Sequence, residues 1–130
     1  MAYVKEILDA ANTNIDSLKE HFNNRYFRNL MEAAYDVDKK FLLPEGTPPF
    51  KPSKLHEGQT TGQFWQIAKR LDVFYRSDVK PIVREHSFIG ALEALSENEA
   101  KILIAIKEQS LDKLYTNLTL ESLRKIGYFA

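Results

Sequence analysis

Apolar residues recur at helical spacing in several separate stretches of the chain, and this spacing constrains the fold more than any other feature of the sequence. Residues at positions i, i+3, i+4 and i+7 lie on one face of an α-helix, so a stretch with this pattern buries a single apolar stripe. The first stretch places Val4, Ile7, Leu8 and Ala11 at these positions. Similar stripes occur within residues 15–22, 27–34, 64–75 and 82–95. The pattern predicts an all-α fold.

The segment 100–108 differs from these stripes because it is apolar nearly all round. By periodicity alone such a segment fits either a buried strand or a buried helix. Ser96 and Glu99, which precede it, have the spacing of a helix capping box, and Lys107 is a basic residue suited to a helix end. We therefore expect a central, buried helix in this segment, with Ile104 in the core.

The length of the chain, 130 residues with a hydrophobic content of 44%, is that of one domain with a core of its own. We expect a single compact domain of six or seven short helices. Thr119 to Ile126 is the last expected helix, and Gly127 ends it. The expected organisation is N-terminal helices in residues 1–40, a Pro/Gly-rich connector in 41–62 and C-terminal helices in 63–130.

The connector holds four of the five prolines and three of the five glycines. A connector of this length inside a compact domain is usually either functional or disordered. Its apolar side chains favour order, and we expect Leu42, Leu43 and Phe50 to pin it across the helices. Thr60 and Gln63 have capping-box spacing, which predicts that the next helix begins there.

The sequence lacks the residue patterns of most enzyme and metal sites. It has no cysteine, no glycine-rich phosphate-binding motif and no nucleophile motif, and its three histidines are isolated from one another. We therefore expect a protein that is not an enzyme and uses no cofactor or metal. Its longest apolar run is far shorter than the about 20 residues that span a bilayer, and its first residues lack the apolar core of a signal peptide. A soluble intracellular protein is expected.

Basic residues are enriched in one part of a chain whose total charge is zero, with 18 basic and 18 acidic residues. Residues 51–86 contain seven basic and four acidic groups. This strip fits a surface that binds phosphates and stacks bases on Trp65, Phe74 and Tyr75, with a phosphate at a turn in residues 58–62. The alternative is an ordinary solvated helix face whose aromatic side chains are buried, and this interpretation is favoured because Phe64 and Phe74 fall on the apolar stripe.

Two blocks of the sequence support a resemblance to a known family. They are LLPEGTPPF, residues 42–50, and EALSENEAKILIAIKEQSLDKLYTNLT, residues 93–119. In this order they resemble a family of small uncharacterised proteins of T-even-like tailed phages, over roughly residues 40–126. The chain departs from that family's pattern at Phe50, where tyrosine is expected, and at Asn117, where glycine is expected. The resemblance implies a phage protein acting in the cytoplasm of the infected host, and it implies no activity.

The preferred functional hypothesis is a non-enzymatic accessory protein that binds a phage or host protein in replication, transcription or counter-defence. The alternative is binding of nucleic acid or a nucleotide signal through residues 51–86. A purely structural connector and a homo-oligomer both remain open. The candidate binding residues lie in the connector and the basic strip: Pro44, Pro48, Pro49, Phe50, Lys51, Lys54, Lys69, Arg70 and Arg76.

Overall fold

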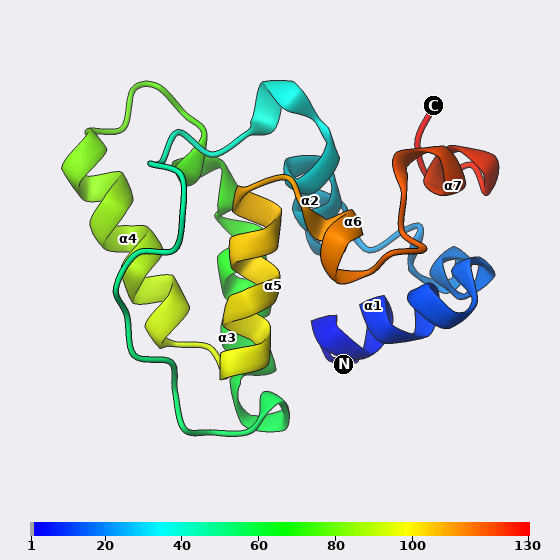
Figure 1. Ribbon diagram of the computed structural model, residues 1–130, viewed down its shortest axis with the longest axis horizontal. Helices are drawn as coiled ribbons and strands as arrows, with labels where there is room; N and C mark the ends of the chain where they lie inside the picture. The colour runs from blue at the N-terminus through cyan, green and yellow to red at the C-terminus, as the bar shows by residue number, and fades with distance from the viewer. Residues whose placement is uncertain (1) are drawn as a thin grey trace.

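The computed structural model describes residues 2–130, which form seven α-helices and three short 3-10 helices (Figure 1). In chain order they are α1 (Val4–Thr13), η1 (Ile15–His21), α2 (Arg25–Tyr35), η2 (Val37–Lys39), α3 (Glu57–Lys69), η3 (Leu71–Phe74), α4 (Pro81–Glu93), α5 (Glu97–Lys107), α6 (Leu111–Leu114) and α7 (Leu120–Lys125). The described residues contain no β-strand, only an isolated bridge between Ser53 and Ser96. The predicted all-α fold is confirmed.

Helix α5 is the centre of the fold, as the sequence predicts. It contacts α1, α2, α3, α4 and α6, and Ile102, Leu103 and Ile106 on it are almost completely buried. Ser96 caps its first turn by accepting a hydrogen bond from the backbone N–H of Glu99. Ile104 is only partly buried, so its expected place in the core is wrong. The core therefore lies along the faces of α5 that carry Leu103 and Ile106.

The apolar stripes fold as their spacing indicates. Val4, Ile7, Leu8 and Ala11 are all buried on α1. The stretch 15–22 forms a 3-10 helix instead of an α-helix, and α6 is a single turn that the sequence pattern did not predict. At the end of the chain, α7 is capped by Thr119, and Gly127 follows it with a φ of 82°, a conformation that glycine adopts without strain.

The expected beginning of the helix after the connector is wrong by four residues. Helix α3 begins at Glu57, and its capping box is formed by His56 and Gln59 instead of Thr60 and Gln63. The Nδ1 atom of His56 accepts a hydrogen bond from the N–H of Gly58 at 3.0 Å, and Gln59 accepts one from the N–H of His56 at 3.2 Å. A ring nitrogen thus takes the role that a hydroxyl or carboxylate usually has at this position.

The long connector is therefore residues 40–56, which we call the strap. It leaves η2, its first part descends between α4 and α5, and its second part crosses α4 in this view before it reaches the start of α3 (Figure 1). Backbone hydrogen bonds attach it near both ends: Leu42 donates to the carbonyl of Phe74 at 2.8 Å, and Ser53 donates to the carbonyl of Leu95 at 2.9 Å. These contacts attach the strap to η3 near its start and to the loop between α4 and α5 near its end.

Candidate functional site

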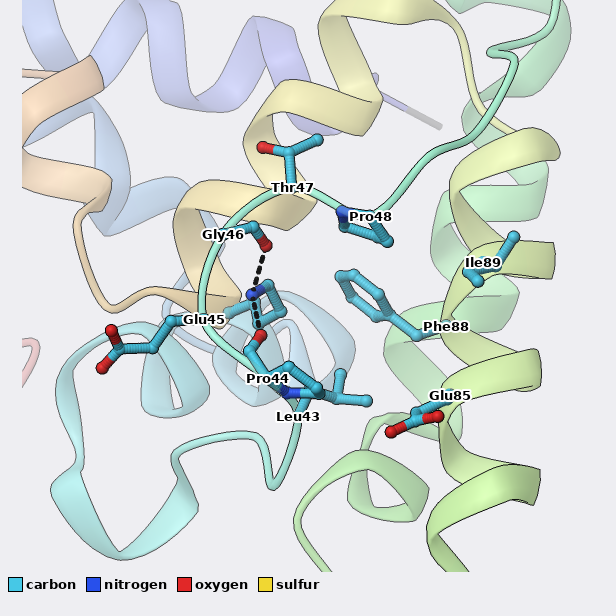
Figure 2. Close-up of a pocket in the computed structure, with 10 residues that line it drawn as sticks. Leu43, Pro44, Glu45, Gly46, Thr47, Pro48, Glu85, Phe88 and Ile89 are labelled. Atoms are coloured by element: carbon cyan, nitrogen blue, oxygen red, sulfur yellow. Dashed lines mark hydrogen bonds between the residues drawn. The ribbon is translucent and has the colours of Figure 1, made fainter.

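A buried lysine holds the first half of the strap. Lys107 is 3% exposed, and its Nζ atom donates to the carbonyl oxygens of Pro44 and Gly46, each at 2.8 Å (Figure 2), and to a carboxylate oxygen of Glu108 at 3.0 Å. These three acceptors match the three protons of an ammonium group. Glu108 also accepts a hydrogen bond from the N–H of Gly46 at 2.6 Å. One residue pair at the end of α5 therefore fixes the turn of the strap around Gly46.

A buried arginine performs a similar task at the start of the strap. The guanidinium group of Arg84, on α4, donates to the carbonyl oxygens of Leu42 at 3.0 Å, Arg76 at 2.9 Å and Val79 at 2.8 Å. Arg84 thus connects the strap to the loop before α4. Because its side chain is buried and used in this way, it does not belong to an exposed basic strip.

The apolar anchors of the strap differ in part from those expected. Phe41 is buried against Phe74 and Phe88, with ring centroids 5.1 and 6.0 Å away. Leu43 and Phe50 are partly buried against the core, whereas Leu42 is 48% exposed. Successive side chains of an extended chain point to opposite sides, so burial of Phe41 and Leu43 turns Leu42 outward. The expectation that Leu42 is an anchor is wrong for this reason.

The strap and α4 enclose an open, mostly apolar cavity of about 210 Å³. Strap residues 43–48 form one wall, and Phe88 and Ile89 of α4 form the other, with Glu85 beside them. Figure 2 shows the ring of Phe88 extending from α4 toward Pro48 of the strap. An apolar cavity of about 150 Å³ already admits a benzene molecule. The cavity can therefore accept one leucine-sized or aromatic side chain.

The candidate residues predicted from the sequence do not form one patch. Pro44 and Pro48 line the cavity, Pro49 is exposed beside it, and Phe50 packs on the core. The other candidates lie elsewhere: Lys51 and Lys54 are exposed near the first turns of α3 and α5, Lys69 and Arg70 are exposed at the end of α3, and Arg76 is exposed before α4. The 13 residues of α3 separate its two ends by about 20 Å. The strap lysines are therefore distant from Lys69 and Arg70.

The aromatic rings, the arginine and the turn proposed for stacking bases and holding phosphates all have other roles in the folded protein. Trp65 and Phe74 are buried, and the indole N–H of Trp65 donates to the carbonyl of Ala2 at 3.1 Å. Arg76 forms ion pairs with Asp78 at 2.7 Å and Asp72 at 3.5 Å. The expected turn at residues 58–62 is wrong, because these residues lie within α3. The helix start proposed to receive a phosphate is therefore not at this position.

A buried carboxyl group, which the sequence pattern does not predict, lies between α3 and α5. Glu99 is 0% exposed; Thr60 donates a hydroxyl hydrogen bond to its Oε1 atom, and the Ser96 hydroxyl lies 3.4 Å from the same atom. Its Oε2 atom has no hydrogen-bond partner among the described residues. Burial raises the pKa of Glu99, and the hydrogen bonds from Thr60 and Ser96 partly oppose this. The sequence spacing assigns Thr60 and Glu99 to two capping boxes, and neither box forms: the box of α3 uses His56 and Gln59, and the side chain of Glu99 contacts Thr60.

Two kinds of feature are absent from residues 2–130. No helix there has the length and apolar character needed to cross a bilayer. No group of three or more histidine, aspartate or glutamate residues there is placed to hold a metal ion. The cavity between the strap and α4 is lined mostly by apolar groups, and the ammonium group of Lys107 beside it is already satisfied by its own acceptors.

The family to which the chain belongs is defined by a match over most of its length. A model described as "Family of unknown function (DUF6433)" matches residues 5–113, and the chain is a member of that family. The match includes the strap, both walls of the cavity and all of α5. No curated protein and no solved structure shows significant similarity to the chain.

Replacement of Lys107 tests its role in holding the strap. Lys107→Met removes the hydrogen bonds to Pro44 and Gly46, and we expect the free energy of unfolding to fall by about 2 kcal/mol, since hydrogen bonds from charged groups contribute more than neutral ones. The amide proton of Gly46 should also exchange faster. Lys101→Met, at an exposed position of the same helix, is the control. Equal results for the two variants in urea unfolding and hydrogen exchange would refute this role.

The buried Glu99 predicts a pH-dependent stability with a definite sign. Its pKa is raised above the ordinary value of 4.5, so the folded protein binds this proton more tightly than the unfolded chain does. The contribution of Glu99 to the free energy of unfolding is therefore greatest below pH 4.5 and declines as the pH rises through the raised pKa. Relative to Glu99→Gln, the parent protein should gain stability as the pH falls from neutral toward 4.5.

The measurement is urea unfolding at a series of pH values, with Glu97→Gln as the control because Glu97 is exposed in the same turn of α5. The Glu97→Gln profile should run parallel to that of the parent. A Glu99→Gln profile that also runs parallel to the parent would contradict the assigned role of the buried carboxyl.

Proposed function

We propose that this protein is a non-enzymatic binding module that captures another protein through the strap face, which comprises strap residues 43–48 and the adjoining side of α4 with Glu85, Phe88 and Ile89. The observation that carries the proposal is the open apolar cavity of about 210 Å³ between these two elements. Protein–protein contacts concentrate their affinity in pockets of this kind, where one side chain of the partner is desolvated.

The construction of the strap supports a binding role. Its prolines and its hydrogen bonds to Lys107 and Arg84 fix the backbone before any partner arrives. A preformed surface loses little conformational entropy on binding, so more of the contact energy contributes to affinity. Burial of one leucine-sized or aromatic side chain in the cavity is worth about 1.5–3 kcal/mol.

The charges near the cavity suggest the chemistry of the partner. Glu85 lies beside the cavity, which favours a basic residue next to the inserted apolar side chain. Further along the strap, Lys51 and Lys54 are exposed and suit an acidic region of the same partner. We propose a partner segment that carries an apolar anchor between charges of opposite sign.

The setting of this interaction is inferred from the sequence. The LLPEGTPPF and C-terminal blocks resemble proteins of T-even-like tailed phages, so we propose that the chain acts in the cytoplasm of an infected bacterium on a phage or host protein. Replication, transcription and counter-defence are the candidate processes. Nucleic-acid binding through residues 51–86 has less support, because Arg84 is buried and Arg76 is paired with aspartates.

A comparison of capture by matched variants tests the proposal. Ile89→Arg places a long charged side chain at the cavity wall, and we expect it to reduce capture of the partner from infected-cell lysate by at least about tenfold. Leu114→Arg is the control, since Leu114 is an exposed apolar residue on α6. The paired change Lys51→Glu with Lys54→Glu should weaken capture less than Ile89→Arg does.

Thermal melting of each variant establishes that it is folded before capture is compared. A partner that binds Ile89→Arg as well as it binds the parent would eliminate the cavity as the binding site. Capture lost only with the lysine changes, and only at low salt, would instead favour an electrostatic contact with nucleic acid or an acidic protein.

A further inference from the structure

The second half of the strap ends at a junction between the beginnings of α3 and α5. The N–H of Ser53 donates to the carbonyl of Leu95 at 2.9 Å, and Ser53 forms an isolated bridge with Ser96. Ser96 caps α5, and its own N–H donates to the hydroxyl group of Thr60 on α3 at 3.3 Å. Two backbone N–H groups thus join the strap, α3 and α5 at this point.

The hydrogen bonds of the junction end on the buried carboxyl group of Glu99. The Thr60 hydroxyl, which accepts from Ser96, donates to Oε1 of Glu99, and the Ser96 hydroxyl donates to the same oxygen at 3.4 Å. The second oxygen, Oε2, has no partner among the described residues, and Glu99 is 0% exposed. Both hydroxyl groups of the junction therefore serve one carboxyl oxygen and leave the other without a donor.

The unpaired Oε2 atom determines which form of Glu99 suits this closed arrangement. A buried neutral hydroxyl without a partner costs less free energy than a buried carboxylate oxygen without a donor. The protonated form of Glu99 therefore fits the junction, and the ionised form requires that water or another donor reach Oε2. The raised pKa of Glu99, which burial causes, has the same direction.

The charged groups around the junction do not favour a carboxylate at this position. Glu57, in the first turn of α3, carries a negative charge that raises the pKa of Glu99 further. The basic groups near Glu57 are engaged elsewhere: His56 lies with its Nε2 atom 3.3 Å from the Glu57 carboxylate, and Lys5 of α1 is paired with Asp9 at 2.7 Å. A second negative charge at Glu99 is therefore disfavoured while the junction is closed.

The strap is the part of the junction that is most easily displaced. Helix α5 packs against α1, α2, α3, α4 and α6, whereas residues 51–56 are attached by the Ser53 hydrogen bond and by a longer one, at 3.3 Å, from the N–H of Lys51 to Glu93. Phe50 packs on the core just before this segment, and Lys107 holds the first half of the strap independently. Residues 51–56 can therefore move without disturbing the strap cavity.

We propose that Ser53, Thr60, Ser96 and Glu99 form a pH-controlled latch on the second half of the strap, closed when Glu99 is protonated and opened more readily when Glu99 gives its proton to water. Opening admits water to the carboxylate and releases residues 51–56. Lys51 and Lys54 lie in the released segment, so any effect of the latch on partner capture rests on the function proposed above. The latch itself needs no partner.

Amide hydrogen exchange of the full chain at a series of pH values tests the latch, after correction for the intrinsic pH dependence of exchange. The protection of the Ser53 amide should fall by at least about threefold between pH 5 and pH 7.5, because the open form binds the Glu99 proton less tightly than the closed form. The Gly46 amide, in the half of the strap that Lys107 holds, should keep its protection.

Replacement of Glu99 separates the latch from other effects of pH. Glu99→Gln keeps the shape of the side chain and cannot ionise, so the protection of Ser53 should lose the threefold change. Any contribution of His56 is common to the parent and the variant and cancels in this comparison. A Ser53 profile that is the same in both proteins would overturn the latch.

A pair of threonine variants provides a second test that does not need the Glu99 variant to fold. Thr60→Val removes the hydroxyl that connects Ser96 with Glu99, so the Ser53 and Ser96 amides should be at least about threefold less protected already at pH 5. Thr61→Val is the matched control, because the Thr61 hydroxyl has no partner among the described residues. Equal protection of Ser53 in the two variants would contradict the latch.

The amide of Leu103, at the buried centre of α5, distinguishes local opening from unfolding of the whole domain. The account expects Ser53 to exchange faster than Leu103 at every pH. Equal protection of the two amides would overturn the latch, because Glu99 would then be exposed only when the core unfolds. Since exchange is measured without a partner, these outcomes are independent of whether the strap cavity binds one.

Discussion

The ammonium group of Lys107 is the contact on which the candidate site depends. Placing a charged group where it is 3% exposed is unfavourable unless every proton has an acceptor, and here two strap carbonyls and Glu108 provide them. The same hydrogen bonds give acceptor partners to two strap carbonyls, which have no intrahelical donor because the strap is not helical. The strap therefore has a fixed shape without regular secondary structure, and that shape leaves a cavity against α4.

The helices could be predicted from the sequence, and the polar contacts between them could not. Stripes such as Val4, Ile7, Leu8 and Ala11 report a helix face directly, because burial of an apolar face depends on local spacing. Lys107 and Arg84 carry charges that ordinarily indicate solvent, and their burial depends on strap carbonyls at least 42 residues away in the chain. The capping roles that the sequence predicts for the side chains of Thr60 and Glu99 are wrong for the same reason, since their contact spans 39 residues. The cavity depends on these long-range contacts. The sequence therefore indicates only the wall that the proline-rich strap forms, and not the cavity itself.

Helix α4 contributes to the core, to the attachment of the strap and to the wall of the cavity. Its inner face completes the core through Phe88 and Leu92, and Arg84 fastens it to the strap. One flank, with Glu85 and Ile89, lines the cavity proposed to bind a partner.

A preformed cavity requires a strap that is rigid in the free protein, and backbone ¹⁵N relaxation measures this rigidity residue by residue. Leu43, Glu45, Gly46 and Thr47 have amide protons and surround the Lys107 contact. We expect order parameters for these residues close to about 0.85, the value of rigid backbone. Values below about 0.6 would contradict it, because a strap that moves on this timescale cannot maintain a preformed cavity.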